Sequence, residues 1–216
     1  MIEKILSAVA ERYPLASKSV GEFSSFKAKG MRFTCSAYHA KGLGHLSIMQ
    51  ANGFFGLMKM DTLVICPEDK DLPLLSYDRI YAMGNDTLIM ELYDTLLGDM
   101  DYSKIDEVIS KYAYLPNRFQ EGEEPSHWYD DIRLPQSIAK KGKKKHGFDE
   151  MVKAYVDGYL SMDGVVCPTQ EKREKTSIYA EGLLKNGGPA TDVLRKELGE
   201  EKTAKLLRSV LFGTQE

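Results

Sequence analysis

The residue with the clearest capacity for chemistry is Asp78, an acid inside a segment of β-strand character. Residues 74–83 are rich in Leu, Ile and Tyr, and residues 87–93 follow as a second such segment after the turn formers 84–86. Side chains alternate along a strand, so Asp78 shares its face with small and apolar neighbours. These neighbours are Leu74, Ser76, Ile80 and Ala82.

A carboxyl group on such a face has its charged form disfavoured, because burial removes water from around it. Its pKa then rises, and it becomes a proton donor near neutral pH. Two other interpretations of Asp78 remain open. It would pair with an Arg or Lys on a neighbouring strand, or its face would be solvated.

Other charged residues form two groups. The run KKGKKKH contains Lys140, Lys141, Lys143, Lys144 and Lys145, which would either dock an acidic partner protein or form a solvated loop. Arg118 and Arg133 flank Trp128, and a guanidinium binds a carboxylate with two parallel hydrogen bonds. Ion pairs with nearby acids are the alternative for both arginines. None of the four histidines has the i, i+4 spacing of a metalloprotease site.

Composition describes an ordinary water-soluble chain of 216 residues with a net charge of -3. The mild acidity argues against a nucleic-acid partner, and no stretch is apolar enough to predict a membrane span, so no membrane partner is expected. The three cysteines are far apart in the chain, which predicts neither a disulfide framework nor a zinc site and favours the cytoplasm.

The spacing of apolar residues changes along the chain, and these changes predict the elements that position Asp78. Residues 2–13 have helical spacing, and residues 31–94 read as five or six short strands, including FFGLMKM (54–60), joined by short turns. Residues 116–147 are rich in Pro and Gly and read as irregular. Helical segments follow to the end of the chain. We therefore predict one domain over residues 1–216, an α/β (α+β) fold: an α/β/α sandwich whose central, mostly antiparallel sheet is flanked by N-terminal and C-terminal helices.

Three stretches in this order resemble one protein family. They are VICPEDKDLPLLSYDRI (64–80), HWYDDIRLPQSIAKKG (127–142) and the helical region 171–213, which includes Tyr179 and Lys185-Asn186. The family is that of the ferredoxin-dependent bilin reductases, with their plant relative red chlorophyll catabolite reductase. The resemblance implies an oxidoreductase of haem catabolism that reduces an open-chain tetrapyrrole such as biliverdin. It also implies no bound cofactor, and reduced ferredoxin or flavodoxin as the external electron donor, docked at the lysine run.

The resemblance places Asp78 at the family's acidic position, as the catalytic proton donor. The pigment would lie between the sheet and the C-terminal helices. The residues that the resemblance and the face pattern offer for binding it are His45, Thr62, Ser76, Arg118, Arg133, Asn186 and Asp192.

The chain departs from the family at three positions. Thr62 aligns where some members have a His. The position at which some members have a Glu falls near Ser47, and His45 shares the face of Ser47. A second family carboxylate aligns near 187–188, where Asp192 is the nearest acid. These departures keep two alternatives open: a non-catalytic protein that binds a bilin or haem, and an interaction protein that uses the lysine run.

Overall fold

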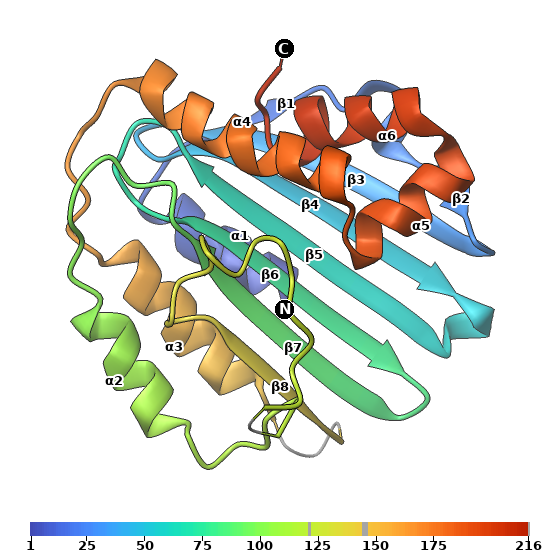
Figure 1. Cartoon of the computed structure of the whole chain (residues 1–216), viewed down its shortest axis with the longest axis horizontal. Helices are drawn as coiled ribbons and strands as arrows, with labels where there is room; N and C mark the ends of the chain where they lie inside the picture. Colours follow the sequence, from blue (N-terminus) through green and yellow to red (C-terminus); the bar gives the residue numbers. More distant parts are fainter. Residues whose placement is uncertain (121, 144–146, 216) are drawn as a thin grey trace.

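One antiparallel sheet runs through the computed structural model, which describes residues 1–120, 122–143 and 147–215 (Figure 1). Within these residues the sheet has eight strands in the order β1-β3-β4-β5-β6-β7-β8, and β2 also pairs with β3. The strands are β1 (Leu15–Lys18), β2 (Phe26–Ala28), β3 (Met31–Ala40), β4 (Gly44–Gly53), β5 (Met58–Pro67), β6 (Leu74–Ala82), β7 (Asn85–Tyr93) and β8 (Ile138–Lys143).

Helices cover both faces of this sheet, which confirms the predicted α/β/α sandwich. One layer contains α1 (Ile2–Ala10), α2 (Ser103–Lys111) and α3 (Asp149–Leu160). The other contains α4 (Thr169–Asn186), α5 (Pro189–Leu198), α6 (Glu200–Lys205) and a π-helical turn, η4 (Leu206–Leu211). In Figure 1, α4 to α6 lie in front of the sheet and α1 lies behind it. Two 3₁₀ turns, η1 (Gly21–Ser24) and η2 (Phe54–Gly56), connect strands.

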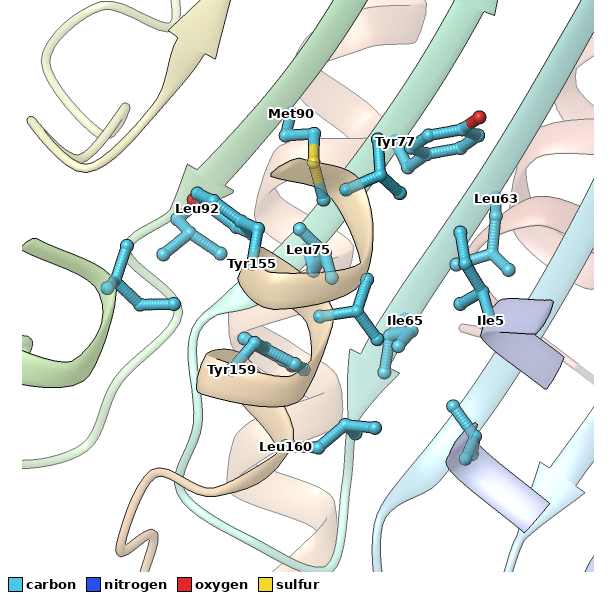
Figure 2. Packing of buried hydrophobic residues seen from close by; sticks show 14 of the residues in the cluster. Ile5, Leu63, Ile65, Leu75, Tyr77, Met90, Leu92, Tyr155, Tyr159 and Leu160 are labelled. Atoms are coloured by element: carbon cyan, nitrogen blue, oxygen red, sulfur yellow. The ribbon is translucent and has the colours of Figure 1, made fainter. Parts of the chain in front are cut away.

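Alternation along the strands produces two separate cores. On β6, Leu75 and Tyr77 point to the layer of α1 to α3, whereas Leu74 points to the layer of α4 to η4. Figure 2 shows how α3 packs: Tyr155 and Tyr159 lie over the strands that carry Leu75 (β6) and Leu92 (β7). Each large apolar side chain buried in this way contributes about 1.5–3 kcal/mol. Asp78 is four residues from Leu74 on the same strand, so its side chain points to the same face, toward the C-terminal helices.

The hairpin that carries Asp78 is confirmed, with a shorter turn than the sequence predicted. Strands β6 and β7 pair from Leu74↔Tyr93 to Ala82↔Asn85, so that only Met83 and Gly84 form the turn. Both have positive φ, 50° and 76°, which is the geometry of a tight two-residue hairpin turn.

Three other expectations about the elements were wrong. Residues 54–56 form the 3₁₀ turn between β4 and β5, and only residues 58–60 of FFGLMKM belong to a strand. The first helix ends at residue 10 rather than 13. Residues 116–147 are not wholly irregular, because β8 pairs there with β7. The lysines of this strand made the segment look like a polar loop in the sequence. Lysines commonly protect an edge strand from pairing with another chain.

The remaining sequence features of the described chain are simple to place. The cysteines Cys35, Cys66 and Cys167 are all free. None of the helices in the described ranges combines the length and the apolar character that a membrane crossing requires.

Candidate functional site

Asp78 lies at the centre of a small polar cluster on three strands. Thr62 stands directly opposite it on β5, and Ile89 stands opposite it on β7. The hydroxyl of Thr62 donates a hydrogen bond of 2.5 Å to Oδ1 of Asp78. Ser76, two residues earlier on β6, faces the same side. Antiparallel register thus brings together three of the side chains that the sequence offered: Thr62, Ser76 and Asp78.

The carboxyl group of Asp78 is adapted to hold a proton near neutral pH. Its pKa is raised from the ordinary 3.8 to about 6, chiefly because burial disfavours the carboxylate. The hydrogen bond from Thr62 lowers the pKa, the negative charge of Glu91 raises it, and Arg118 lowers it. Desolvation dominates this balance, as the sequence pattern predicted. No ion pair with Asp78 occurs among the described residues, so the ion-pair alternative is not realised there.

The sheet around Asp78 is apolar and partly open. Met58, Met60, Ile80 and Ile89 lie on this face and are each partly exposed. In Figure 1 no helix stands in front of the lower ends of β5 and β6. Two hollows of about 630 and 300 Å³ lie at another border of the sheet, and Asp78 lines neither. The acid therefore sits on a half-buried apolar surface of the kind that a flat ligand can cover.

Glu91 is a second carboxyl on this face, and the sequence analysis missed it. It lies opposite Ser76 on β7, with its side chain 16% exposed. Its Oε2 accepts a hydrogen bond of 2.7 Å from the hydroxyl of Tyr93, and its Oε1 lies 3.4 Å from Nη1 of Arg133. The alternation of residues 87–93 carried the signal, because Glu91 has the parity that a two-residue turn places beside Ser76.

The raised pKa makes Asp78 a cost to stability at high pH. The folded chain holds a proton that the unfolded chain releases between about pH 4 and pH 6, so the free energy of unfolding falls as pH rises through that window. We expect Asp78→Asn to be more stable than the wild type at pH 8, by about 1–3 kcal/mol, and to lose this advantage near pH 4. Urea unfolding at pH 4, 6 and 8 measures both quantities.

Asparagine suits this test because its Oδ1 still accepts the hydrogen bond from Thr62. The exposed Asp99→Asn is the matched control for removing one carboxylate from the chain. A stability difference for Asp78→Asn that stays constant from pH 4 to pH 8 would contradict the titration proposed for this carboxyl.

His45 belongs to the C-terminal anchor rather than to the cluster of Asp78. Its Nε2 lies 2.8 Å from the carbonyl of Val210, and the hydroxyl of Ser47 donates 2.7 Å to the carbonyl of Leu211. Gly213, with φ 63°, passes so close that a Cβ there would lie 2.5 Å from Cγ of His45. Burial lowers the pKa of His45 to about 4, so the ring is neutral at pH 7. His45 therefore connects β4 to the π-helical turn through its hydrogen bond with Val210.

The two candidate arginines have different surroundings. Arg133 binds Glu124 at 2.5 Å, Asp130 at 3.2 Å and Glu91 at 3.4 Å, which is the ion-paired alternative. Arg118 is exposed, lies over the ring of Phe119 and forms no ion pair in the ranges that the structure describes. Its backbone N–H donates to the carbonyl of Ala139 on β8 at 2.9 Å, and its positive charge lowers the pKa of Asp78. Arg118 is thus an exposed guanidinium near enough to influence the charge of Asp78.

Asn186 and Asp192 lie at the junction of α4 and α5, and both are exposed. Asp192 packs its carboxylate against Gly187 and lies 3.4 Å from Nη1 of Arg195. Trp128 donates from Nε1 to the carbonyl of Gly187 at 2.9 Å, which fixes this junction to the preceding loop. Across the described ranges, no hydrogen bond or ion pair links Asn186 or Asp192 to Asp78.

The lysine run is not one surface. Lys140 points to the layer of α2 and α3, is 6% exposed, and donates to the carbonyl of Leu115 at 3.1 Å and to Asn117 at 2.7 Å. Its inclusion in a docking surface was wrong, because strand alternation turns it inward. Lys141 and Lys143 are exposed on β8. Lys144 and Lys145 lie outside the described residues.

Comparison with known proteins supports the fold. No family model and no curated relative matches this sequence. Among solved structures, the chain is similar to phytochromobilin synthase from tomato in complex with biliverdin, with a TM-score of 0.76. The match covers 99% of this chain and 82% of the synthase, at 16% sequence identity. The resemblance that the sequence motifs indicated is confirmed at the level of the fold.

Proposed function

We propose that this protein is a bilin-reductase-like oxidoreductase that reduces an open-chain tetrapyrrole. The pigment binds on the half-buried face around Asp78, beneath the C-terminal helices. One observation carries the proposal: a carboxyl group with a pKa of about 6 stands in the middle of an apolar, partly open sheet face. The same fold holds biliverdin in the tomato synthase.

The chemistry requires protons at the pigment and electrons from outside. Reduction of one double bond consumes two electrons and two protons, and we assign the electrons to an external ferredoxin or flavodoxin. As negative charge builds on the pigment, Asp78 delivers a proton, and Thr62 holds its carboxyl in place. Proton transfer from a positioned acid typically accelerates a reaction by about 10²–10⁴-fold. Glu91, on the same face, offers a second carboxyl for the next proton.

Binding and docking use residues around this cluster. Arg118 binds a propionate of the pigment, because its guanidinium is exposed and has no acid paired with it in the described ranges. Lys141 and Lys143, exposed at the outer strand β8, attract the acidic surface of the electron donor. Lys140 has no part in that docking, since its amine is buried.

Titration with a panel of bilins and haem, followed by absorbance, tests the proposal. We expect biliverdin or a related bilin to bind with a shift of its visible band. Arg118→Ala should raise the Kd about tenfold or more, since a charge-assisted hydrogen bond is lost. Arg12→Ala, which removes an exposed arginine from the end of α1, is the matched control and should bind like the wild type. Absence of any band shift across the panel would reject tetrapyrrole binding.

A non-catalytic tetrapyrrole carrier is the second candidate. A two-electron reduction needs two protons, and Glu91, the second carboxyl on this face, already accepts a hydrogen bond from Tyr93 and lies beside Arg133. An anaerobic assay with reduced ferredoxin separates the candidates. The reductase consumes electrons and changes the bound pigment, while a carrier shifts the spectrum on binding and then leaves it constant.

A further inference from the structure

Four bulky apolar side chains project from the tips of two neighbouring hairpins. The β4–β5 tip carries Phe54, Phe55 and Leu57, and the β6–β7 tip carries Met83. Leu57 is 69% exposed, Met83 is 88% exposed and Phe55 is fully exposed. The N–H of Met83 donates to the carbonyl of Leu57 at 3.4 Å, which links the two tips. In Figure 1 these tips lie along the lower right border of the sheet.

The backbone at this border is strained in order to present these side chains. In the described chain, the non-glycine residues with positive φ are Lys29, Phe54, Phe55 and Met83, at 49°, 51°, 55° and 50°. Each lies in a tip along the same border. A left-handed conformation costs a non-glycine residue about 1–2 kcal/mol, and Gly or Asn would relieve it. Large apolar side chains at such positions indicate that their outward projection is itself useful.

Positive charge surrounds the apolar tips. Lys27, Lys29, Arg32 and Lys59 are all exposed here, and none forms an ion pair in the parts of the chain that are described. Acids at this border have other partners: Glu197 accepts from the backbone of Lys29 at 2.7 Å, Asp61 accepts from Gln50 at 2.8 Å, and Asp86 is buried in its pair with Arg79. Cations therefore outnumber anions along this border.

A hollow at this border is lined by both charged and apolar residues. It has a volume of about 630 Å³, and Lys27, Arg32 and Asn52 line it together with Phe54 and Phe55. A space of this size, lined by two cations, an amide and two aromatic rings, suits a phosphate headgroup whose acyl chains continue past the rings. Apolar side chains that dip below the headgroups, with lysines at their level, are the usual elements of interfacial membrane binding.

We propose that this border docks the protein on an anionic phospholipid surface. Phe54, Phe55, Leu57 and Met83 insert to the depth of the glycerol backbone, and the hollow takes one lipid phosphate between Lys27 and Arg32. Exposed apolar residues on separate tips, with cations beside them, fit a fluid lipid surface better than the continuous, closely packed surface of a protein partner. The sequence analysis expected no membrane partner, because composition reveals spanning segments and not the spatial gathering of residues from separate hairpins.

Vesicle co-sedimentation tests this proposal with the full chain. We expect the wild type to bind phosphatidylcholine vesicles that contain about 30% phosphatidylserine, and to bind pure phosphatidylcholine at least about fivefold more weakly. Phe55→Ser with Leu57→Ser should lower the partition coefficient about tenfold or more. Arg32→Glu with Lys59→Glu should lower it to a similar extent on anionic vesicles alone.

Ile178→Ser is the matched control, because Ile178 is an apolar residue on α4 that is 69% exposed. This variant should bind vesicles like the wild type. Circular dichroism of each variant verifies that the fold is retained. Equal binding of the tip variant and the wild type would overturn the proposal, and so would a wild type that ignores both vesicle types. The latter result is also the one expected if this border docks a protein instead.

Discussion

Asp78→Asn is expected to stop reduction of the bound bilin while sparing its binding. The amide has the shape of the acid and keeps the hydrogen bond from Thr62, so the site retains its geometry. Its amide N–H is too weak an acid to protonate the pigment, and turnover should fall by about 10²-fold or more. The Kd of the pigment should change by less than about threefold. Anaerobic turnover with reduced ferredoxin, beside an absorbance titration, measures both values.

The pH dependence of turnover provides an internal check. An acid with a pKa of about 6 must be protonated to act, so the wild-type rate should decline as pH rises above 6. Thr62→Val removes a hydrogen bond that lowers this pKa, so the decline should move to higher pH without abolishing activity. Asp99→Asn should match the wild type throughout. Normal turnover by Asp78→Asn would remove Asp78 from the mechanism, whatever binds to the face.

The position of Asp78 was predictable because it depends on local rules. A two-stranded pattern, a turn and alternation suffice to place an acid on one face, and both the hairpin and the face are as predicted. To predict the position of Glu91, the length of the turn must be known to within one residue. A three-residue turn at 84–86 would set Glu91 opposite Arg79, on the other face of the sheet, whereas the turn at Met83 and Gly84 sets it opposite Ser76.

The charged residues were harder to assign because their partners are distant in sequence. The lysine run was treated as one patch, yet strand alternation sends Lys140 into the interior, where burial lowers its pKa. Lys172 lies in the helical region 171–213, where nothing in the sequence predicts its burial. It is buried, and its Nζ binds Asp71 at 3.1 Å and the carbonyls of Leu72 and Thr95 at 2.8 and 2.6 Å. No local pattern reveals a contact between residues 101 positions apart.

The strongest stability effect is expected at Arg79, which joins the hairpin of Asp78 to the opposite helical layer. Its Nε and Nη2 bind both carboxylate oxygens of Asp86 at 3.0 and 2.8 Å, and its Nη1 binds Asp149 at 2.5 Å. Burial opposes the charge of the guanidinium, but the hydrogen bonds that Arg79 donates to Asp86 and Asp149 raise its pKa above the ordinary value. Arg79 and Asp86 therefore form a buried pair that depends on both members.

Arg79→Met keeps much of the side-chain volume and leaves Asp86 without its partner in a site that is fully buried. An unpaired buried charge costs about 3–5 kcal/mol, so the free energy of unfolding should fall by that amount in urea titrations at pH 7. Arg12→Met, at an exposed position, should change it by less than about 0.5 kcal/mol. Adding Asp86→Leu to Arg79→Met should recover part of the loss, because the orphaned charge is removed. If the double variant were no more stable than Arg79→Met alone, the loss would come from packing around the hairpin and not from the stranded carboxylate of Asp86.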